Sequence, residues 1–250
     1  MKSFKEFLME GPASPMLKDL RTVRDVRGAL KRHTGTKDAN HAREAVSDMY
    51  KKLMPQFKAI KKKFERAVNK SLPKGDKQKI KFFSQIKPEK SLINKIVDRG
   101  NAPESIGDIV RGALLFPDSG MVEKFIKDFR RKNSGIIVDY EFKSKGQDKE
   151  LGYFGSHHLD LMIDGLIVEL QVMTRKMWKF KETAHVLYTQ NRDKIARGGH
   201  VSRQDSQLSK QIYALANRED FEGIGEDEFE MLLDEDFAAF EEVELIDLED

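Results

Sequence analysis

The chain of 250 residues contains no cysteine. Without thiols it can form no disulfide scaffold, no cysteine-ligated zinc site and no thiol nucleophile. No stretch approaches the run of about 18 apolar residues that a membrane-spanning helix needs. The opening residues, MKSFKEFLMEG, are too polar for the apolar segment of a secretory signal. We therefore expect a cytoplasmic protein, with no membrane partner and enough length to bury a sizeable core.

Acidic and basic residues are unevenly distributed along the chain. Residues 219–250 include 16 Asp and Glu but no Lys or Arg. The 218 residues before them hold 45 basic and 26 acidic residues, a net charge of +19, although the whole chain carries only +3. A basic body with an acidic tail is typical of a protein that meets polyanions, here nucleotides, nucleic acid or its own tail. The alternative is a tail that only keeps the protein solvated.

Hydrophobic spacing divides the chain into four parts. Residues 1–11 form a leader ending at a Gly-Pro break, and 12–72 form a basic helical region with Pro55 inside its second helix. Residues 73–218 are a mixed domain, and 219–250 are the acidic tail. Phe229, Leu232 and Phe237 lie at helical spacing in that tail, which predicts an acidic amphipathic helix; a disordered tail is the alternative.

Apolar runs of strand length alternate with helical stretches in the mixed domain. An Asp-Gly pair at 164–165 predicts a hairpin because it supplies the two positive-φ positions of a tight turn. The strands are expected at 109–116, 135–142, 158–163 and 166–172, and the helices at 121–132, 174–196 and 205–217. This mixture predicts an α+β fold in which helices flank a mixed β-sheet.

Two carboxylates are the first candidates for chemistry. Glu169 and Gln171 share one face of the strand at 166–172, opposite its apolar residues. Asp108 stands at the start of the apolar run 109–116. An Asp and a Glu on neighbouring strands can hold Mg²⁺, and such a partner offsets the cost of burying a carboxylate. The alternatives are a Glu on a solvated face and an Asp that only caps a turn.

Further polar residues gather around these carboxylates in the sequence. Lysines and a serine at the start of a predicted helix suit a phosphate chain, although an ordinary solvated helix has the same pattern. Tyr153 could stack on a base or fill the core. The residues in these groups are Lys87, Lys90, Ser91 and Lys95 in the basic helix, Tyr153 and His157 in a loop entering a strand, and Glu182 and His185 on one helix face. A satisfied buried histidine is the alternative for His185.

Taken in order, these segments resemble the synthetase domain of the RelA/SpoT family over about 82–192. Four family motifs are matched, each with a departure. The basic motif is matched by Lys87, Ser91 and Lys95, with Pro88 replacing a serine, and the Asp strand is matched by Asp108 and Ile109, with Arg111 two places early. The Gly-Tyr-x-Ser-x-His motif is matched by Gly152, Tyr153 and His157, with Gly155 replacing the serine. The Glu-x-Gln motif is matched by Glu169, Gln171 and Thr174, followed by Glu182 and His185.

The resemblance implies a nucleotidyltransferase-like fold and a Mg²⁺-dependent transfer of pyrophosphate from ATP to the ribose 3′-hydroxyl of GDP or GTP. It assigns Asp108 and Glu169 to the metal, and Glu169 to activation of the hydroxyl. The implied roles are catalysis for Glu169, Asp108 and Gln171; phosphate binding for Lys87, Lys90, Ser91, Lys95, Arg111 and Arg175; acceptor binding for Tyr153, His157 and Lys145; and support for Glu182 and His185.

Two arginines of the family motifs are replaced, by Gln85 and by Met173. Arg111 lies two residues before its expected place, and a shift of two in a strand preserves the face, so it can substitute. Arg175 or Lys145 can substitute for the other. The replacements support a rival function, a non-catalytic nucleic-acid-binding or virion protein on a decayed synthetase scaffold. The net charge of +19 supports another, the same chemistry on the 3′ end of tRNA as a toxin.

The leader carries a second resemblance, to the capsid-targeting leaders of internal head proteins of large tailed phages. Those leaders are cleaved after a Leu/Ile-x-Glu triplet, which Leu8, Met9 and Glu10 match. This resemblance implies a phage protein packaged in the virion head and delivered to the host cytoplasm. A plain N-terminal helix is the alternative.

Overall fold

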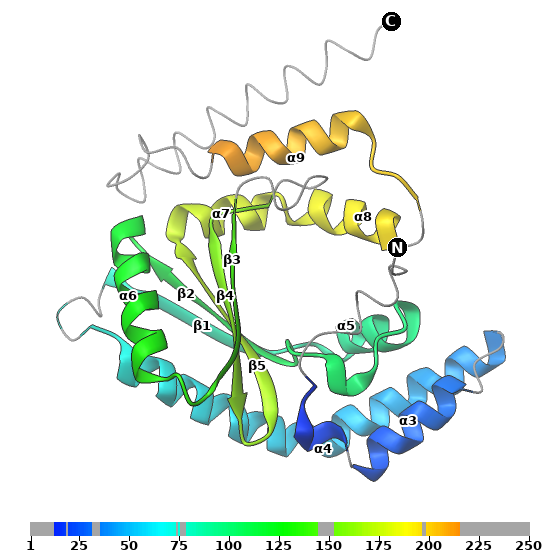
Figure 1. Cartoon of the computed structure of the whole chain (residues 1–250). Coiled ribbons are helices and arrows are strands. Elements are labelled where there is room, and N and C mark those ends of the chain that lie inside the picture. Colours follow the sequence, from blue (N-terminus) through cyan, green and yellow to red (C-terminus); the bar gives the residue numbers. More distant parts are fainter. Residues whose placement is uncertain are drawn as a thin grey trace, which may run out of the picture.

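The computed structural model describes residues 13–18, 20–31, 36–73, 75, 79–144, 153–196 and 199–215 (Figure 1). The leader and the acidic tail lie outside these residues, as does Lys145. The described chain forms a five-stranded mixed sheet flanked by helices, which confirms the predicted α+β class. Among the described helices, none combines the length and the apolar character needed to cross a bilayer.

The sheet has the strand order β1-β2-β5-β4-β3. Strands β2 and β5 are parallel, and the other neighbours are antiparallel. The strands are β1 (Lys81–Ile86), β2 (Val110–Phe116), β3 (Ile137–Lys143), β4 (Ser156–Ile163) and β5 (Leu166–Thr174). The four predicted strands are confirmed, whereas β1 was not predicted. Its residues alternate between exposed and half-buried at the sheet edge, so it lacks the continuous apolar run of a buried strand.

The predicted hairpin joins β4 to β5. Asp164 and Gly165 adopt φ values of +51° and +79°, and Ile163 pairs with Leu166 across the turn. A two-residue turn of this kind sets the register of the whole hairpin. Residues 157–163 of β4 therefore each face a defined residue of β5, and this register decides which residues belong to the site described below.

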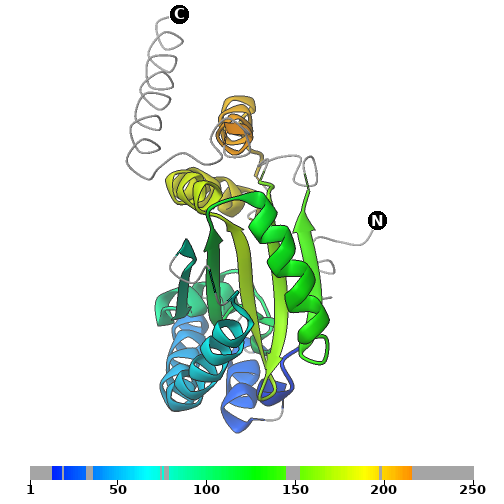
Figure 2. The ribbon, with the colours of Figure 1, turned by 90° about the vertical axis from the view of Figure 1, so that its left-hand side faces the viewer.

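Helices cover both faces of the sheet. Figures 1 and 2 show α4 on one side and α7 with α8 on the other. The helices are α2 (Pro15–Lys18), α3 (Arg21–Lys31), α4 (Thr36–Ser71), α5 (Glu89–Ile93), α6 (Ser119–Lys132), α7 (Arg175–Thr183), α8 (His185–Ala196) and α9 (Arg203–Leu215). A π-helical turn (Asn94–Asp98) follows α5, and a 3₁₀ turn (Pro103–Ser105) precedes β2.

Local signals account for several helix boundaries. Asp118 begins α6 by accepting a hydrogen bond from the Met121 amide at 2.8 Å, and Thr174 begins α7 by accepting from Met177 at 3.1 Å. The predicted helix 174–196 is divided at Ala184 into α7 and α8. Helix α4 continues through Pro55, which the sequence analysis placed inside a helix.

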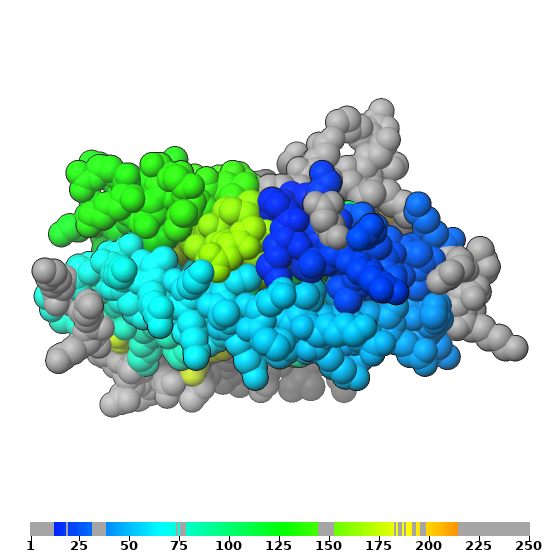
Figure 3. All heavy atoms as spheres, turned by 90° about the horizontal axis from the view of Figure 1, so that it is seen from below, coloured from blue at the N-terminus to red at the C-terminus, as the bar shows by residue number. Residues whose placement is uncertain are grey.

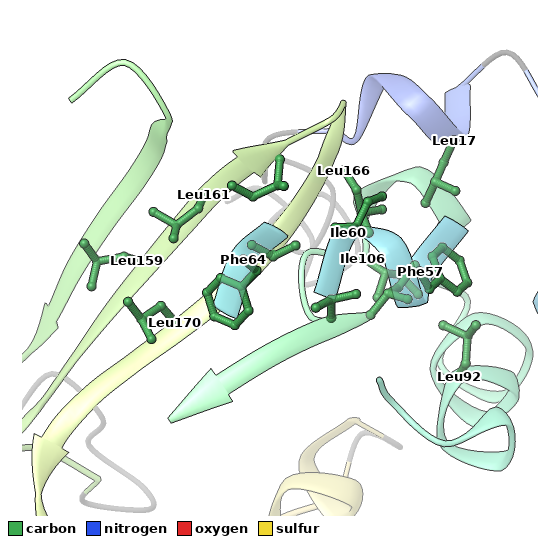
Figure 4. Close-up of a cluster of buried hydrophobic side chains, with 14 of the residues drawn as sticks. Leu17, Phe57, Ile60, Phe64, Leu92, Ile106, Leu159, Leu161, Leu166 and Leu170 are labelled. Atoms are coloured by element: carbon green, nitrogen blue, oxygen red, sulfur yellow. The ribbon is translucent and has the colours of Figure 1, made fainter. Parts of the chain in front are cut away.

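The main core lies between α4, α6 and one face of the sheet. Phe57, Ile60 and Phe64 of α4 belong to the same buried cluster as Leu161 and Leu170 of the strands (Figure 4). Figure 3 shows α4 running along this side of the molecule, with α3 and α6 beside it. Burial of these apolar side chains of α4 against the sheet removes apolar area from water and so stabilises the fold.

A second, smaller core lies on the opposite face of the sheet, beneath α7, α8 and α9. Leu115 of β2 and Met173 of β5 pack there with Met177 and Phe180 of α7 and Tyr213 of α9. The cluster covers only one end of this face. The remaining part carries polar side chains, and it forms the walls of a cleft.

Gly112 of β2 marks a close approach between the sheet and α4. A Cβ atom at this position would lie 2.8 Å from Cε1 of Phe64 and 2.9 Å from Cε2 of Phe82. Because Phe64 is fully buried, its ring has no free space to move into. We expect Gly112→Ala to lower the free energy of unfolding by about 1–3 kcal/mol. Denaturant unfolding measures this change.

Gly135→Ala is the matched control, since a Cβ there meets no atom within 4 Å. Equal stability of the two variants would contradict the close approach of α4 to β2.

Candidate active site

Strand register places five polar residues on one face of the sheet. His158 and Asp160 of β4 pair with Gln171 and Glu169 of β5, and Arg111 of β2 pairs with Glu169. Residues paired across neighbouring strands point to the same side of a sheet. The five side chains therefore form one polar surface, opposite the face that packs on α4 and α6.

This surface lines two cavities that share a wall. The first, the carboxylate cavity, has a volume of about 390 Å³ and is lined by Lys95, Asp108, Arg111, Asp160, Glu169 and Lys181, among others. The second, the aromatic cavity, has a volume of about 550 Å³, and its lining includes Phe83, Gln85, Arg111, Gln171, Trp178 and Lys181. Arg111, Gln171 and Lys181 line both, so the two cavities form one cleft with two compartments.

Glu169 is held from both of its oxygens. His158 Nδ1 lies 3.2 Å from Oε1, and Gln171 Nε2 donates a hydrogen bond of 2.8 Å to Oε2. Burial acts to raise the pKa of Glu169, but the hydrogen bond and the charge of His158 outweigh it, so the pKa lies below its ordinary value. Glu169 is thus an oriented carboxylate that is ionised at neutral pH.

A short polar chain supports His158 from behind. On the other side of the ring, His158 Nε2 lies 3.0 Å from the Ser156 hydroxyl and 3.3 Å from the Tyr153 hydroxyl. The Ser156 hydroxyl also lies 2.7 Å from that of Tyr153. This arrangement fixes both the ring orientation of His158 and the oxygen that it contacts.

Asp108 lies between two lysines. Lys87 Nζ is 2.8 Å from its Oδ2, and Lys95 Nζ is 2.9 Å from its Oδ1. Burial acts to raise the pKa of Asp108, but Lys95 and Lys87 together lower it to about 2. Burial also lowers the pKa of Lys87. Lys87 directly follows β1, Lys95 lies in the π-helical turn, and Asp108 comes two residues before β2. The packing of these segments therefore brings the three residues together.

Two further side chains have strongly shifted pKa values. Burial, followed by repulsion from Glu169, Asp139 and Asp108, raises the pKa of Asp160 to about 7. Burial lowers the pKa of Lys181 to about 8, against the attraction of Glu169. Lys181 Nζ donates to the Gln171 side-chain oxygen, which links it through Gln171 to Glu169. Perturbed titratable groups gathered in a cleft are typical of an active site.

No protein-family model matches this sequence, and the search of curated proteins found no match. Solved structures do match the fold. Small alarmone synthetase 1 from Bacillus subtilis, bound to its product pppGpp, is 19% identical, with a TM-score of 0.50 over 69% of this chain and 92% of that chain. Another structure of the same synthetase gives 16% identity and a TM-score of 0.51 over 68% and 92%. The fold is that of a small alarmone synthetase.

On this synthetase fold, several residues singled out from the sequence come together. Asp108, Glu169, Gln171, Lys95 and Arg111 line the carboxylate cavity. Arg111 lies opposite Gln85 in the β1–β2 ladder, and in the amide orientation that satisfies both groups the Gln85 oxygen accepts two hydrogen bonds from it, at 2.9 Å and 2.8 Å. Arg111 therefore projects from the expected face in spite of its shifted position.

Other phosphate-binding candidates lie apart from this group. Lys87 is buried beneath Asp108, and Lys90 and Ser91 are exposed on α5 and line neither cavity. Arg175 donates to the backbone carbonyl of Lys79 and lines neither cavity. Of the lysines in the basic motif, only Lys95 reaches the cleft.

The acceptor-binding candidates are placed differently from one another. His157 lies on the opposite face of the sheet, with Nδ1 2.9 Å from the Tyr140 hydroxyl and Nε2 3.2 Å from Glu123. Tyr153 borders the carboxylate cavity, but its ring is only 7% exposed and packs edge-on against Tyr213 at 5.2 Å. The ring therefore fills the second core in this structure.

The two supporting candidates lie on either side of the break between α7 and α8. Glu182 is exposed near the end of α7 and lines the aromatic cavity. His185 is the first residue of α8, and its side chain lies outside what the structure describes.

Among the cleft residues that sequence reasoning missed are His158, Asp160 and Lys181. A signal for the first two was present, because the Asp-Gly turn pairs residue 163 with 166 and hence 160 with 169 and 158 with 171. The family motif pointed instead to His157, one residue away and on the other face. Lys181 had no comparable signal, since only the packing of α7 on the sheet brings it to Gln171.

The donor atoms of the carboxylate cavity suit a hard divalent cation. Asp108, Asp160 and Glu169 line it. Burial makes the largest contribution to the raised pKa of Asp160, and repulsion from the other two carboxylates raises it further. In the part of the chain that the structure describes, no three His, Cys, Asp or Glu side chains converge closely enough to hold an ion alone. A Mg²⁺ ion commonly takes one or two carboxylates and completes its shell with water and substrate phosphates. The cavity has the groups for that mode of binding.

Proposed function

We propose that this protein transfers pyrophosphate from ATP to the ribose 3′-hydroxyl of a guanosine nucleotide, GDP or GTP. The observation that carries the proposal is the oriented, ionised Glu169 in a cleft with Lys95, Arg111 and Lys181, on a small alarmone synthetase fold. Small alarmone synthetase 1 from Bacillus subtilis was solved once with its product pppGpp and once with AMPCPP. That synthetase therefore binds a guanosine product and an adenosine nucleotide analogue.

In the proposed reaction Glu169 acts as the general base. The acceptor's 3′-hydroxyl gives its proton to the Glu169 carboxylate as its oxygen bonds to the β-phosphorus of ATP, and the bond from that phosphorus to the α-phosphate oxygen breaks to release AMP. His158 and Gln171 hold the carboxylate in one orientation during this step. A general base in such a position contributes roughly 10²- to 10⁴-fold in rate.

The cations of the cleft neutralise the charge that the phosphates bring. Arg111 and Lys181 line both compartments, so they lie where a phosphate chain crosses from one to the other. Lys95 lines the carboxylate cavity beside Asp108. Phosphoryl-type transfer depends mainly on positioning and charge stabilisation. Lys181 supplies a cation from α7, on the face of the sheet where Met173, now part of the second core, replaces the family's arginine.

One or two of the carboxylates of Asp108, Asp160 and Glu169 would hold Mg²⁺ together with phosphate oxygens. When bound, the ion supplies a positive charge that neutralises the phosphates and relieves the repulsion among these carboxylates. When no ion is bound, Lys87 and Lys95 keep Asp108 ionised and oriented.

Transfer of a label from ATP tests the proposal and identifies the acceptor. The protein is incubated with Mg²⁺ and γ-labelled ATP, together with GDP, GTP or bulk tRNA. The expected result is label on GDP or GTP, with AMP released in equal amount. The net charge of +19 in residues 1–218 favours tRNA as the second candidate, and label on tRNA alone would make the protein a tRNA-modifying enzyme instead. Absence of label on every acceptor would refute pyrophosphate transfer and favour a non-catalytic nucleic-acid-binding protein.

A further inference from the structure

The aromatic cavity has a flat apolar side and a charged side. Phe83 of β1 and Trp178 of α7 form the apolar side, while Arg111 and Lys181 lie where this cavity meets the carboxylate cavity. Phe83 shares its face of β1 with Gln85, the residue that pairs with Arg111. Crossing the cleft thus leads from aromatic rings to cations and then to carboxylates.

The two rings are arranged as a stacking surface. Their planes differ by 16°, and their centroids are 6.4 Å apart. Phe83 is 51% exposed, the most exposed large hydrophobic side chain in the described part of the chain. Lys181 Nζ lies 5.5 Å from the centroid of the Trp178 ring, which sets a cation beside the same surface. A single exposed Phe is unremarkable in a protein, but an exposed ring parallel to a Trp at the wall of a cavity is suited to a planar ligand.

The order of groups across the cleft matches the order of groups in a nucleoside triphosphate. Nucleobases stack on aromatic side chains, and a purine offers a larger ring surface than a pyrimidine. From a base on Phe83 and Trp178, the phosphate chain would pass Arg111 and Lys181 and enter the compartment that contains Glu169. The reverse orientation would put the charged phosphates against the two apolar rings.

We propose that Phe83 and Trp178 bind the purine base of the pyrophosphate donor by stacking. The identification of that donor as ATP rests on the proposed function, whereas binding of the base is measurable without any transfer. The pair would set the preference for a purine donor, and its rings lie in the compartment next to the one that holds Glu169.

Trp178 is the only tryptophan of the chain, so its fluorescence reports directly on this surface. The full-length protein is titrated with ATP, with CTP and with GDP, each without a second nucleotide. We expect ATP to quench the emission in a saturable way, and CTP to bind more weakly. Phe83→Ala should weaken ATP binding roughly tenfold, because a base–aromatic stack contributes about that factor or more.

Phe142→Ala is the matched control. Phe142 is also an exposed aromatic strand residue, 44% exposed, but it lies on β3 against His157 and lines neither cavity. We expect this variant to bind ATP like the unsubstituted protein. Equal ATP affinity of the Phe83→Ala and Phe142→Ala variants, or no quenching by ATP, would overturn the stacking proposal even if pyrophosphate transfer is observed.

Two further outcomes separate this proposal from the proposed function. Quenching that is saturable with GDP but absent with ATP would overturn the assignment to the donor, since the pair would then hold the acceptor base. Quenching by ATP that Phe83→Ala weakens, in a protein that transfers no label, would support the base site while refuting the transfer.

Discussion

Glu169→Gln is expected to lower the rate of pyrophosphate transfer roughly 10³-fold, because an amide cannot accept the proton of the attacking hydroxyl. The side chain keeps its size and can still contact His158 and Gln171, so the cleft should retain its shape. The rate of label transfer from ATP, measured at saturating nucleotide, gives the effect. Nucleotide binding followed by Trp178 fluorescence should change far less than the rate.

Glu123→Gln is a matched control for this substitution. Glu123 also contacts a histidine, His157, at 3.2 Å, but on the opposite face of the sheet. We expect its rate of transfer to equal that of the unsubstituted protein. A Glu169→Gln variant that remains as active as the Glu123→Gln variant would exclude Glu169 as the base.

Lys181→Met is expected to lower the rate roughly 10²-fold or more, because it removes a cation from the position where the phosphate chain crosses between the compartments. Lys132→Met, an exposed lysine of α6 on the other face of the sheet, should leave the rate unchanged. A small effect at Lys181 would mean that Arg111 and Lys95 suffice to hold the phosphates.

The same lysine should produce a pH dependence on the alkaline side. Its pKa of about 8 means that the amine is charged below that pH and becomes neutral as the pH rises through it. Transfer should therefore decline above about pH 8 in the unsubstituted protein. Lys181→Arg keeps its charge throughout this range, so its decline should be displaced to higher pH. Profiles of kcat/KM against pH for the two proteins measure the difference, and superimposable profiles would contradict the assignment.

Local patterns predicted most of the fold. The apolar runs and the Asp-Gly turn placed β2, β3, β4 and β5 because burial on the sheet and a two-residue turn leave clear marks on neighbouring residues. Strand β1 was missed because an edge strand needs no continuous apolar run. The N-terminal helices were expected, but their close packing on the sheet through Phe64 and Gly112 depends on contacts between distant segments.

The candidate site divides in a similar way. Glu169 and Gln171 were found by their alternation on one strand, and the hairpin register extends that face to His158 and Asp160. The choice between His157 and His158 shows how sensitive such reasoning is, since a shift of one residue moves a side chain to the other face.

By itself, the amino-acid order determined the hairpin, its register and the set of polar side chains that share a face with Glu169, because turn chemistry and the two-residue period of a strand act over a few residues. Tertiary structure alone decided which cations meet those side chains. Lys95 reaches Asp108, Lys87 is buried beneath it and Lys181 reaches Gln171, because separate segments pack at particular distances. Contacts of that kind depend on the packed core as a whole, and no local pattern records them.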